Sequence, residues 1–537
     1  MPLITGRLAC ALLFLASSTS GNGESTIKLD VPAIAPVKNQ IIDSRFFSHS
    51  IELSYLVDYA GNLTHPNTLS NNLIRNLYLV TGSYPIVRVG GSTQNHATWV
   101  QNQTEAIVLN FSDPSADQPD NVTLGPAFLE SFKTFPDGTQ YIFGLNFFDG
   151  EIGKQDAVLE ARNVYQSLKD RLYAFEIGNE FDGFPVNRSR ETWSLEAYVE
   201  QWLYFAGTIS GNVSIPKPFF QAGVFATLTA NPDIPQIGNT PWTAETAIDH
   251  GITGTGQART FTEHTYIGVS SNSSLLPPVP LPSLDQNLLN HTFLAHHMEY
   301  FVEQSRYSVA HGLPYVIGET NSLASQGLQG VSNVFGAALW SIGYALYTAA
   351  ATNVSRLHFH NGTPYRYSVW QPVTATGATN ATNATTPAHA RPLYYGNMFV
   401  ANALGNPRGH MPQNGSASTW KVAFLVEEAR FTAYAVFSVA QGAQTLRHIA
   451  LVNMDGRWSA DPAKVGKEKT VKLPEDSRGA AEVRRLTGAA VDLAQGVTWA
   501  GRTVDPDGNL VGMEVVERVQ SGGEVTVQPG EAVLLSF

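Results

Sequence analysis

The feature that most constrains the fold is an alternation, repeated eight times, of a short β-like run with a longer helix-like or loop-like segment. Several of the runs are nearly continuous apolar stretches, as expected of strands covered on both faces. Strands that alternate with helices form parallel sheets, and eight such units close into a barrel. The pattern therefore predicts an α/β fold, a (β/α)8 TIM barrel, with strands near residues 50–55, 85–89, 141–145, 172–177, 219–225, 261–267, 315–317 and 355–359.

The residue pattern of the sequence changes near residue 398. Helix-length patterns give way to short alternating strands separated by Gly, Pro, Asp and Asn turns, which is typical of a β-sandwich. A chain of 537 residues is long enough for a large barrel and a second module. We expect the barrel over residues 24–397 and a C-terminal β-sandwich domain over 398–537. Residues 24–45 precede the first barrel strand and are candidates for pairing with the sandwich.

The N-terminus has the pattern of a secretory signal. Arg7 precedes the apolar run 8–16, and small polar residues follow it. A membrane anchor would need about 20 apolar residues, roughly twice this run. We therefore expect a signal peptide over residues 1–23, secretion to the extracellular space and no membrane span in the mature protein. The single cysteine, Cys10, lies inside this segment, which predicts a mature chain without disulfides or thiolate metal sites.

Thirteen Asn-x-Ser/Thr sequons occur along the chain. So many sequons behind a signal sequence favour a secreted glycoprotein whose sequons lie in surface loops. The one at Asn361 is doubtful as an acceptor because Pro364 follows it. The other candidates for glycosylation are Asn62, Asn102, Asn110, Asn121, Asn187, Asn212, Asn272, Asn290, Asn353, Asn380, Asn383 and Asn414.

Composition excludes several classes of function. The formal net charge is −12, whereas a nucleic-acid-binding protein needs clustered positive charge. The adjacent His296 and His297 lack the spacing and acidic partners of a metal site. The glycine-rich stretch 251–256 has no Lys-Ser/Thr pair to hold a phosphate. We expect no nucleic-acid partner, no metal and no cofactor.

Two glutamates stand where buried strands are expected to end. Glu180 follows the run 172–177, and Glu319 follows 315–317 after a single glycine. The C-terminal ends of barrel strands form the active-site rim, and a pair of carboxylates there is the machinery of glycoside hydrolysis. Glu176 is the competing candidate, but it lies within its strand, which favours Glu180. A carboxylate separation of about 5–5.5 Å would mean retention of configuration and about 6.5–9.5 Å inversion; the sequence leaves both open.

Five motifs together resemble glycoside hydrolase family 79, the β-glucuronidase and heparanase family of clan A. The resemblance spans about residues 30–400 and extends to the β-sandwich that the family also has. The fungal secreted branch is most similar, through segments 50–52, 58–62 and 358–363. The five motifs are Val87-Arg88-Val89-Gly90-Gly91, Phe143-Gly144-Leu145-Asn146, Glu176-Ile177-Gly178-Asn179-Glu180, His264-Thr265-Tyr266 and Gly318-Glu319-Thr320-Asn321-Ser322.

The resemblance implies roles for individual residues. Glu180 would be the acid/base and Glu319 the nucleophile of a retaining mechanism. Asn179 would hold the sugar 2-hydroxyl, and Tyr266 would orient the nucleophile. Arg88 would lie beneath the site and help keep Glu319 ionised, the alternative being an ordinary strand-end salt bridge.

Recognition of the sugar is where the chain departs from the family pattern. Glu52 matches an acidic position that grips hydroxyls of the terminal sugar. Relatives have Tyr-Gly-Gly after the nucleophile, whose backbone N–H groups help to bind a uronate carboxylate, whereas this chain has Leu-Ala-Ser-Gln-Gly at 323–327. This departure implies a pocket of different shape, which would admit a 4-O-methyl group. The candidate donors are Ser325, Gln326 and Gly327, with Tyr365 and Tyr367 either as further donors or as aromatic packing at the rim.

The resemblance implies a secreted, retaining exo-β-glucuronidase. Its substrate would be terminal glucuronic acid, or the 4-O-methyl form, on plant or fungal glycans such as arabinogalactan side chains. One alternative is an endo-acting heparanase-like enzyme or a neutral-sugar glycosidase of clan A. An endo-enzyme for sulfated chains is expected to carry basic runs beside its cleft, which this sequence lacks. Another alternative is a non-catalytic carbohydrate-binding wall protein.

Overall fold

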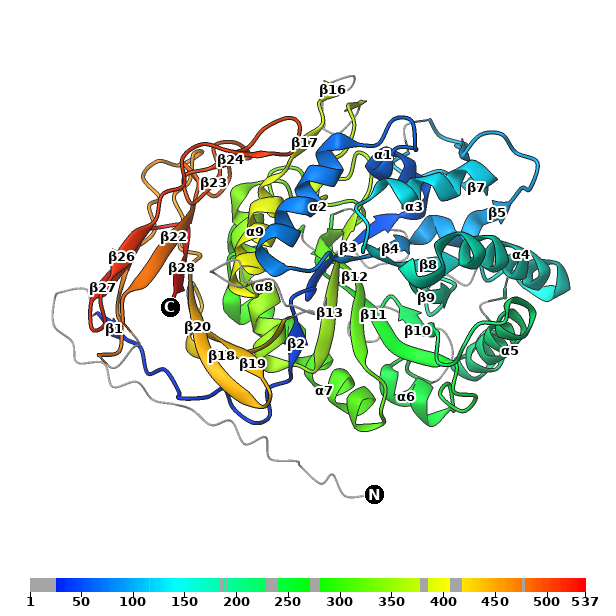
Figure 1. The fold of residues 1–537 in the computed structure, drawn as a ribbon, viewed down its shortest axis with the longest axis horizontal. Coiled ribbons are helices and arrows are strands. Elements are labelled where there is room, and N and C mark those ends of the chain that lie inside the picture. Colours follow the sequence, from blue (N-terminus) through cyan, green and yellow to red (C-terminus); the bar gives the residue numbers. More distant parts are fainter. Residues whose placement is uncertain are drawn as a thin grey trace.

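A computed structural model describes residues 26–114, 116–183, 188–189, 191–227, 240–270, 281–376, 385–405, 418–475 and 479–537. The expected signal peptide therefore lies outside the described residues. Eight parallel strands close into a barrel, surrounded by helices (Figure 1), which confirms the predicted fold class. In barrel order the strands are β3 (Phe47–Glu52), β4 (Ile86–Gly90), β8 (Gln140–Leu145), β9 (Leu172–Ile177), β10 (Phe220–Phe225), β11 (Ala258–Val269), β12 (Tyr315–Ala324) and β13 (Val354–Asn361).

Two strands extend further toward the mouth than the sequence predicts. β11 continues to Val269 and β12 to Ala324, and the two remain paired to their ends. The first strand is shifted the other way, because residues Leu53–Tyr55, predicted to be its end, form a 3-10 turn after Glu52. Glu319 and Tyr266 therefore lie within long strands rather than at strand ends.

The barrel interior changes from apolar at one end to charged near the mouth. Ile86, Ile142 and Ala174 form a small buried apolar cluster. Two residues further along β4 and β9 stand Arg88 and Glu176, on the same face of their strands because side chains alternate with a period of two. This switch places a buried charged network directly below the mouth.

Helices cover the outside of the barrel between successive strands. The helix that follows β12, α8, is apolar on all sides and almost wholly buried, as expected of a helix covered on every side. Figure 1 shows α8 and α9 between the barrel strands and the second domain. The main helices are α2 (Thr68–Thr81), α4 (Gly150–Leu168), α5 (Leu195–Val213), α6 (Ala244–Asp249), α7 (His291–Ala310), α8 (Phe335–Ala351) and α9 (Pro392–Ala403).

The connection from β4 to β8 departs from the β/α alternation. It contains a small three-stranded sheet of β5 (Ala97–Trp99), β7 (Asn121–Leu124) and β6 (Ile107–Asn110). Short helical turns flank this sheet, Ser92–His96 before it and Pro126–Glu130 after it. This connection, the excursion between β4 and β8, brings its own side chains to residues at the barrel mouth that are distant in the sequence.

The second domain is a β-sandwich of unequal sheets. Its large sheet has the order β2-β18-β19-β20-β28-β22-β23, and β1, β21 and β27 form the small one. Apolar side chains from both sheets, such as Phe431, Leu451 and Val471, fill the space between them. The strands are β1 (Ile27–Lys28), β2 (Ile42–Asp43), β18 (Thr419–Glu428), β19 (Phe431–Ala440), β20 (Ala443–Asn453), β21 (Lys469–Lys472), β22 (Ala481–Thr487), β23 (Thr498–Trp499), β27 (Glu524–Val527) and β28 (Glu531–Ser536).

Both ends of the chain contribute to this domain. β1 pairs with β21 and β2 pairs with β18, so the segment before the barrel joins the sandwich. The boundary expected between residues 397 and 398 falls inside α9, a helix that packs on α2 and α8 of the barrel. The first sandwich strand after the barrel, β18, begins at Thr419.

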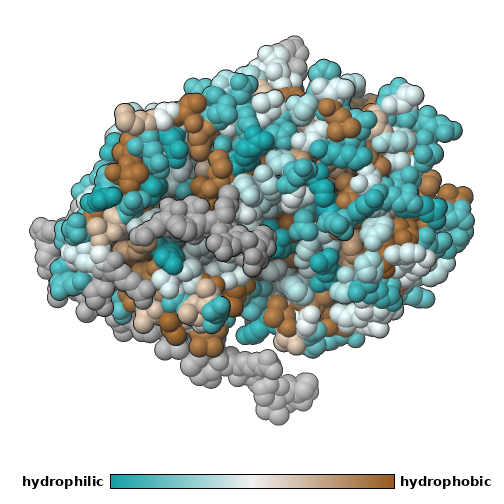
Figure 2. All heavy atoms as spheres, viewed as in Figure 1, coloured by the Kyte–Doolittle hydropathy of each residue, from teal (hydrophilic) through white to brown (hydrophobic). Residues whose placement is uncertain are grey.

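The surface is mixed in character. On the face seen in Figure 2, hydrophobic residues form scattered groups among hydrophilic ones. Among the described residues, no helix is long and apolar enough to cross a membrane.

Candidate active site

Glu180 stands just beyond β9 in an unusual backbone conformation. β9 ends at Ile177, and both Gly178 and Glu180 have left-handed φ angles of 71° and 58°. A non-glycine residue in this region is strained, and such strain persists only where the surroundings impose it. Here the Glu180 N–H donates a 2.8 Å hydrogen bond to the Val224 carbonyl at the end of β10. The turn thus fixes the glutamate at the barrel mouth.

Glu319 reaches the mouth from β12 and is held on both carboxylate oxygens. Arg88 donates to its Oε2 at 2.6 Å, and the Tyr266 hydroxyl donates to its Oε1 at 2.7 Å. His360 Nδ1 lies 3.7 Å from Oε2. Glu319 is therefore oriented by an arginine on β4 and a tyrosine on β11.

The two glutamates face each other. A carboxylate oxygen of Glu180, a carboxylate oxygen of Glu319 and a ring nitrogen of His264 all lie within 4.8 Å of one another. His264 Nδ1 is 2.9 Å from Glu180 Oε1. The two carboxyl groups are therefore close enough to act on one sugar.

Their pKa values are shifted in opposite directions. Burial raises the pKa of Glu180 to about 8, and the negative charge of Glu319 adds to this shift. Burial also acts to raise the pKa of Glu319, but its interactions with His360, His264 and Arg88 and the Tyr266 hydrogen bond hold the pKa well below its usual range. Two carboxyls whose pKa values are shifted apart in this way can be present as one protonated and one ionised group at the same pH.

Arg88 is the fully buried centre of this network. Its guanidinium pairs with Glu176 at 2.6 Å as well as with Glu319, and it donates to Asn179 Oδ1 at 2.7 Å and to Ser50 Oγ at 3.1 Å. Burial alone would lower the pKa of Arg88, but the Glu176 and Glu319 carboxylates raise it above its usual range. Glu176 is thus engaged in an internal ion pair, away from the open side of the site.

Two hydrogen bonds to the Asn95 side chain hold the backbone of Asn179. Its N–H donates to Asn95 Oδ1 at 2.9 Å, and the Asn95 amide donates to the Asn179 carbonyl at 2.7 Å. With its Oδ1 bound by Arg88, the side-chain NH2 group is the part of Asn179 that remains for a ligand hydroxyl.

Glu52 ends β3 with no exposed surface and is bound by three partners. Thr93 donates to its Oε1 through both N–H and hydroxyl, at 2.9 and 2.5 Å. Gln118 donates to Oε2 at 2.9 Å, and His360 Nε2 lies 3.3 Å from the same oxygen. Gly91 passes so close that a Cβ there would lie 2.5 Å from Glu52 Oε2.

The segment after Glu319 forms a tight left-handed turn beside the β13 loop. Ser325, Gln326 and Gly327 have φ angles of 59°, 61° and 80°. A Cβ on Gly327 would lie 2.9 Å from the backbone nitrogen of Tyr367. The turn and the loop after β13 therefore form one wall of the mouth.

Both candidate tyrosines of that loop are buried. Tyr367 packs beside Tyr266, with their ring centroids 5.9 Å apart. Tyr365 packs edge-on against Tyr55 at 5.9 Å. Tyr367 thus lies beside the tyrosine that binds Glu319, whereas Tyr365 belongs to the aromatic packing of the rim.

Several residues at the mouth were not identified from the sequence. His264 and His360 lie within segments that carried the family resemblance, but the motifs gave them no role. Thr93, Asn95 and Gln118 come from the excursion between β4 and β8, where no motif marked them. Their contacts join segments up to 84 residues apart.

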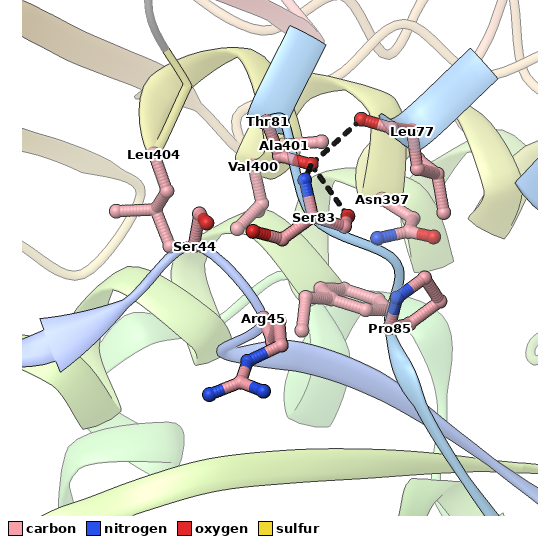
Figure 3. Close-up of a pocket in the computed structure, with 11 residues that line it drawn as sticks. Ser44, Arg45, Leu77, Thr81, Ser83, Pro85, Asn397, Val400, Ala401 and Leu404 are labelled. Atoms are coloured by element: carbon pink, nitrogen blue, oxygen red, sulfur yellow. Dashed lines mark hydrogen bonds between the residues drawn. The ribbon is translucent and has the colours of Figure 1, made fainter. Parts of the chain in front are cut away.

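Among the described residues, Glu180, His264 and Glu319 are the one group of acidic and histidine side chains close enough to share a metal ion. Arg88 already supplies positive charge to Glu319, so a metal there would compete with an ion pair. A small pocket shown in Figure 3 is a separate feature: it lies between α2, α9 and the start of β3, at the opposite end of the barrel.

The described sequons differ in accessibility. Asn62, Asn102, Asn110, Asn121 and Asn212 are exposed. Asn290 and Asn353 are half-buried. The candidates outside the described residues are Asn187, Asn272, Asn380, Asn383 and Asn414.

The doubtful sequon at Asn361 is blocked by the fold. Its side chain is fully buried and donates to the carbonyls of Ser50 and Phe359 at 3.0 and 2.7 Å.

Comparison with known proteins identifies the family. The chain matches the "Glycosyl hydrolase family 79 C-terminal beta domain" over residues 433–534. It is 31% identical to a β-glucuronidase of Aspergillus niger over 487 residues, covering 85% of this chain and 82% of that protein. A β-glucuronidase of Neurospora crassa is 30% identical, covering 96% of this chain and 97% of the relative.

Solved structures share the fold. A 4-O-α-L-rhamnosyl-β-D-glucuronidase from Fusarium oxysporum has a TM-score of 0.75 at 23% identity, over 95% of this chain and all of that one. A family 51 α-L-arabinofuranosidase from Thermotoga petrophila has a TM-score of 0.58 at 13% identity, over 95% and 99%. With two relatives at 30% identity or more along most of their length, and two facing carboxylates at the barrel mouth, this chain is a glycoside hydrolase and belongs to family 79.

Proposed function

We propose that the protein is a retaining, exo-acting β-glucuronidase. It would release terminal glucuronic acid, or its 4-O-methyl form, from glycans such as arabinogalactan side chains. The observation that carries the chemistry is the approach of Glu180 and Glu319 to within 4.8 Å with pKa values shifted apart. The sugar is inferred from the two relatives named β-glucuronidase.

The first step would form a covalent intermediate. A carboxylate oxygen of Glu319 attacks the anomeric carbon while Glu180 gives its proton to the glycosidic oxygen. The carbon–oxygen bond to the leaving group breaks, an ester bond to Glu319 forms, and the leaving group departs as an alcohol. The high pKa of Glu180 keeps the proton available for this transfer.

Water would complete the cycle. Glu180, now ionised, takes a proton from a water that attacks the same carbon, and the ester bond to Glu319 breaks. Two displacements restore the original configuration, which is the basis for proposing retention. Tyr266 and Arg88 hold Glu319 in place and stabilise it when it leaves as a carboxylate.

Two features support recognition of a terminal uronic acid. The turn 325–327 presents successive backbone amides, an arrangement that binds anions. At Glu52, the connection between β4 and β8 reaches the mouth through Gln118, and a loop at this place is expected of an enzyme that accepts a chain end. We further propose that the protein is secreted and glycosylated, because of its N-terminal signal pattern and exposed sequons.

Turnover of an aryl β-glucuronide tests the activity, with the aryl β-glucoside as the neutral comparison. Glu180→Gln and Glu319→Gln are expected to lose activity by at least about a hundredfold. NMR of the first-formed product should show the β-anomer, and azide should rescue Glu319→Gly with formation of the inverted glycosyl azide. Near-normal turnover by both glutamine variants would contradict the proposal.

A further inference from the structure

Arg366, in the loop after β13, contacts two separate segments of the barrel mouth. Its backbone N–H donates to the Gln326 carbonyl and its Nε to the Gly327 carbonyl, both at 2.8 Å. Its NH2 group pairs with Asp117 Oδ2, also at 2.8 Å. One side chain thus links the loop after β13 to the turn after Glu319 and to the excursion between β4 and β8.

The contacts of Arg366 bind carbonyl oxygens of the 325–327 turn and none of its amide groups. The carbonyl of Ser325 accepts from the Ser270 hydroxyl at 2.6 Å, so all three carbonyls of the turn are bound from outside. Within the described part of the chain, the amides of Ser325 and Gln326 have no hydrogen-bond acceptor. Two non-glycine residues with left-handed φ need external support to stay in place. Arg366 supplies that support through two of the three carbonyls.

The contact with Asp117 extends the same link to Glu52. Asp117 is fixed by a 2.7 Å hydrogen bond from the Tyr55 hydroxyl to its carbonyl. The next residue, Gln118, donates to Glu52 Oε2. Movement of Arg366 would therefore disturb the turn directly and the Glu52 side of the mouth through Asp117.

We propose that Arg366 is a positioning residue that sets specificity for an acidic sugar. It holds the 325–327 turn so that the amides of the turn face the carboxylate of the sugar. Through Asp117, it also holds the loop on the Glu52 side of the mouth. This inference rests on the proposed function, because it assumes a uronic acid in the site. It requires that Arg366 act through its hydrogen-bond geometry rather than through its charge alone.

The test compares an aryl β-glucuronide with the matching aryl β-glucoside. Arg366→Gln should raise KM for the glucuronide at least about tenfold, the loss expected when hydrogen bonds to a charged group are impaired, with a much smaller change in kcat. kcat/KM for the glucoside should change less than threefold. Arg366→Lys keeps the charge but not the planar fork, so it should resemble Arg366→Gln rather than the wild type. Asp117→Asn should shift the substrate ratio in the same direction by a smaller factor.

Arg430 offers a matched control. It holds the carbonyls of Asp285 and Leu289 and pairs with the Asp285 carboxylate, the same kind of support at a site away from the mouth. Arg430→Gln should leave the glucuronide-to-glucoside ratio unchanged, even if stability falls. An unchanged ratio in Arg366→Gln, or full recovery in Arg366→Lys, would overturn the positioning role alone. A wild type that does not prefer the glucuronide would overturn the proposed function and this inference with it.

Discussion

Arg88 and Glu176 form an ion pair 2.6 Å long in which neither side chain has any exposed surface. The same guanidinium also binds Glu319, so one cation serves two buried carboxylates. Breaking a buried pair leaves an uncompensated charge, which costs far more than losing an exposed pair. The network therefore stabilises the barrel interior as well as orienting Glu319.

Arg88→Met is expected to lower the free energy of unfolding by about 3–5 kcal/mol, because it leaves Glu176 and Glu319 unpaired. Adding Glu176→Gln should recover part of this loss, since one stranded charge is then removed. Urea denaturation of the single and double variants measures the coupling. Glu517→Gln, which breaks the half-exposed pair with Arg485, serves as the control and should cost less than about 1 kcal/mol. An Arg88→Met protein within about 1 kcal/mol of the wild type would contradict this account.

The pH dependence of kcat/KM should follow the two glutamates. Glu180 has a pKa raised to about 8, so the proton donor is lost, and kcat/KM falls, as the pH rises through about 8. Glu319 has a pKa below its usual range, so it remains ionised down to pH values below about 4. Glu180→Ala, assayed with an aryl glucuronide whose leaving group needs little protonation, should lose the basic limb. A basic limb that persists in this variant would show that another group titrates.

Gly91→Ala should damage recognition by Glu52. A Cβ at Gly91 would lie 2.5 Å from Glu52 Oε2, and the φ of 99° adds backbone strain. We expect KM for the glucuronide to rise about tenfold or more, with no further loss when Glu52→Ala is added. Gly251→Ala is the control, because Gly251 has a φ of 88° but open space around its Cβ position. Equal effects of the two substitutions on KM would mean that strain, not displacement of Glu52, is responsible.

The sequence predicted the barrel well where burial controls the residue pattern. Leu172–Ile177 is continuous and apolar except for Glu176, and the predicted strand coincides with β9. The extension of β12 to Ala324 was missed because Asn321 and Ser322 are polar; they are buried in the structure through hydrogen bonds to neighbouring strands and loops. Local patterns describe apolar burial, but they carry no information on polar groups satisfied by distant partners.

The same limit applies to the site. Glu180 and Glu319 could be located because each follows an apolar run and belongs to a recognisable motif. Gln118 and Arg366 lie in loops far in sequence from the residues they support, and neither stands at a strand end. Their roles depend on which loops meet at the mouth, which only the folded structure shows.

Glu160, on α4, gives a prediction about stability rather than catalysis. It is fully buried, and burial, with the nearby Asp156 carboxylate, raises its pKa well above its usual range. Because this pKa is raised in the folded state, the contribution of Glu160 to the free energy of unfolding is fully present below its unfolded-state pKa of about 4.3. That contribution is lost as the pH rises toward the folded-state pKa. Over that window the loss is about 1.4 kcal/mol per pH unit. Glu160→Gln cannot ionise, so its stability relative to the wild type should rise between pH 4 and pH 8, measured by urea denaturation at each pH. Glu200→Gln, at an exposed position of α5, should show a constant difference. A constant difference for Glu160→Gln as well would mean that the pKa of Glu160 in the folded protein is the same as in the unfolded chain.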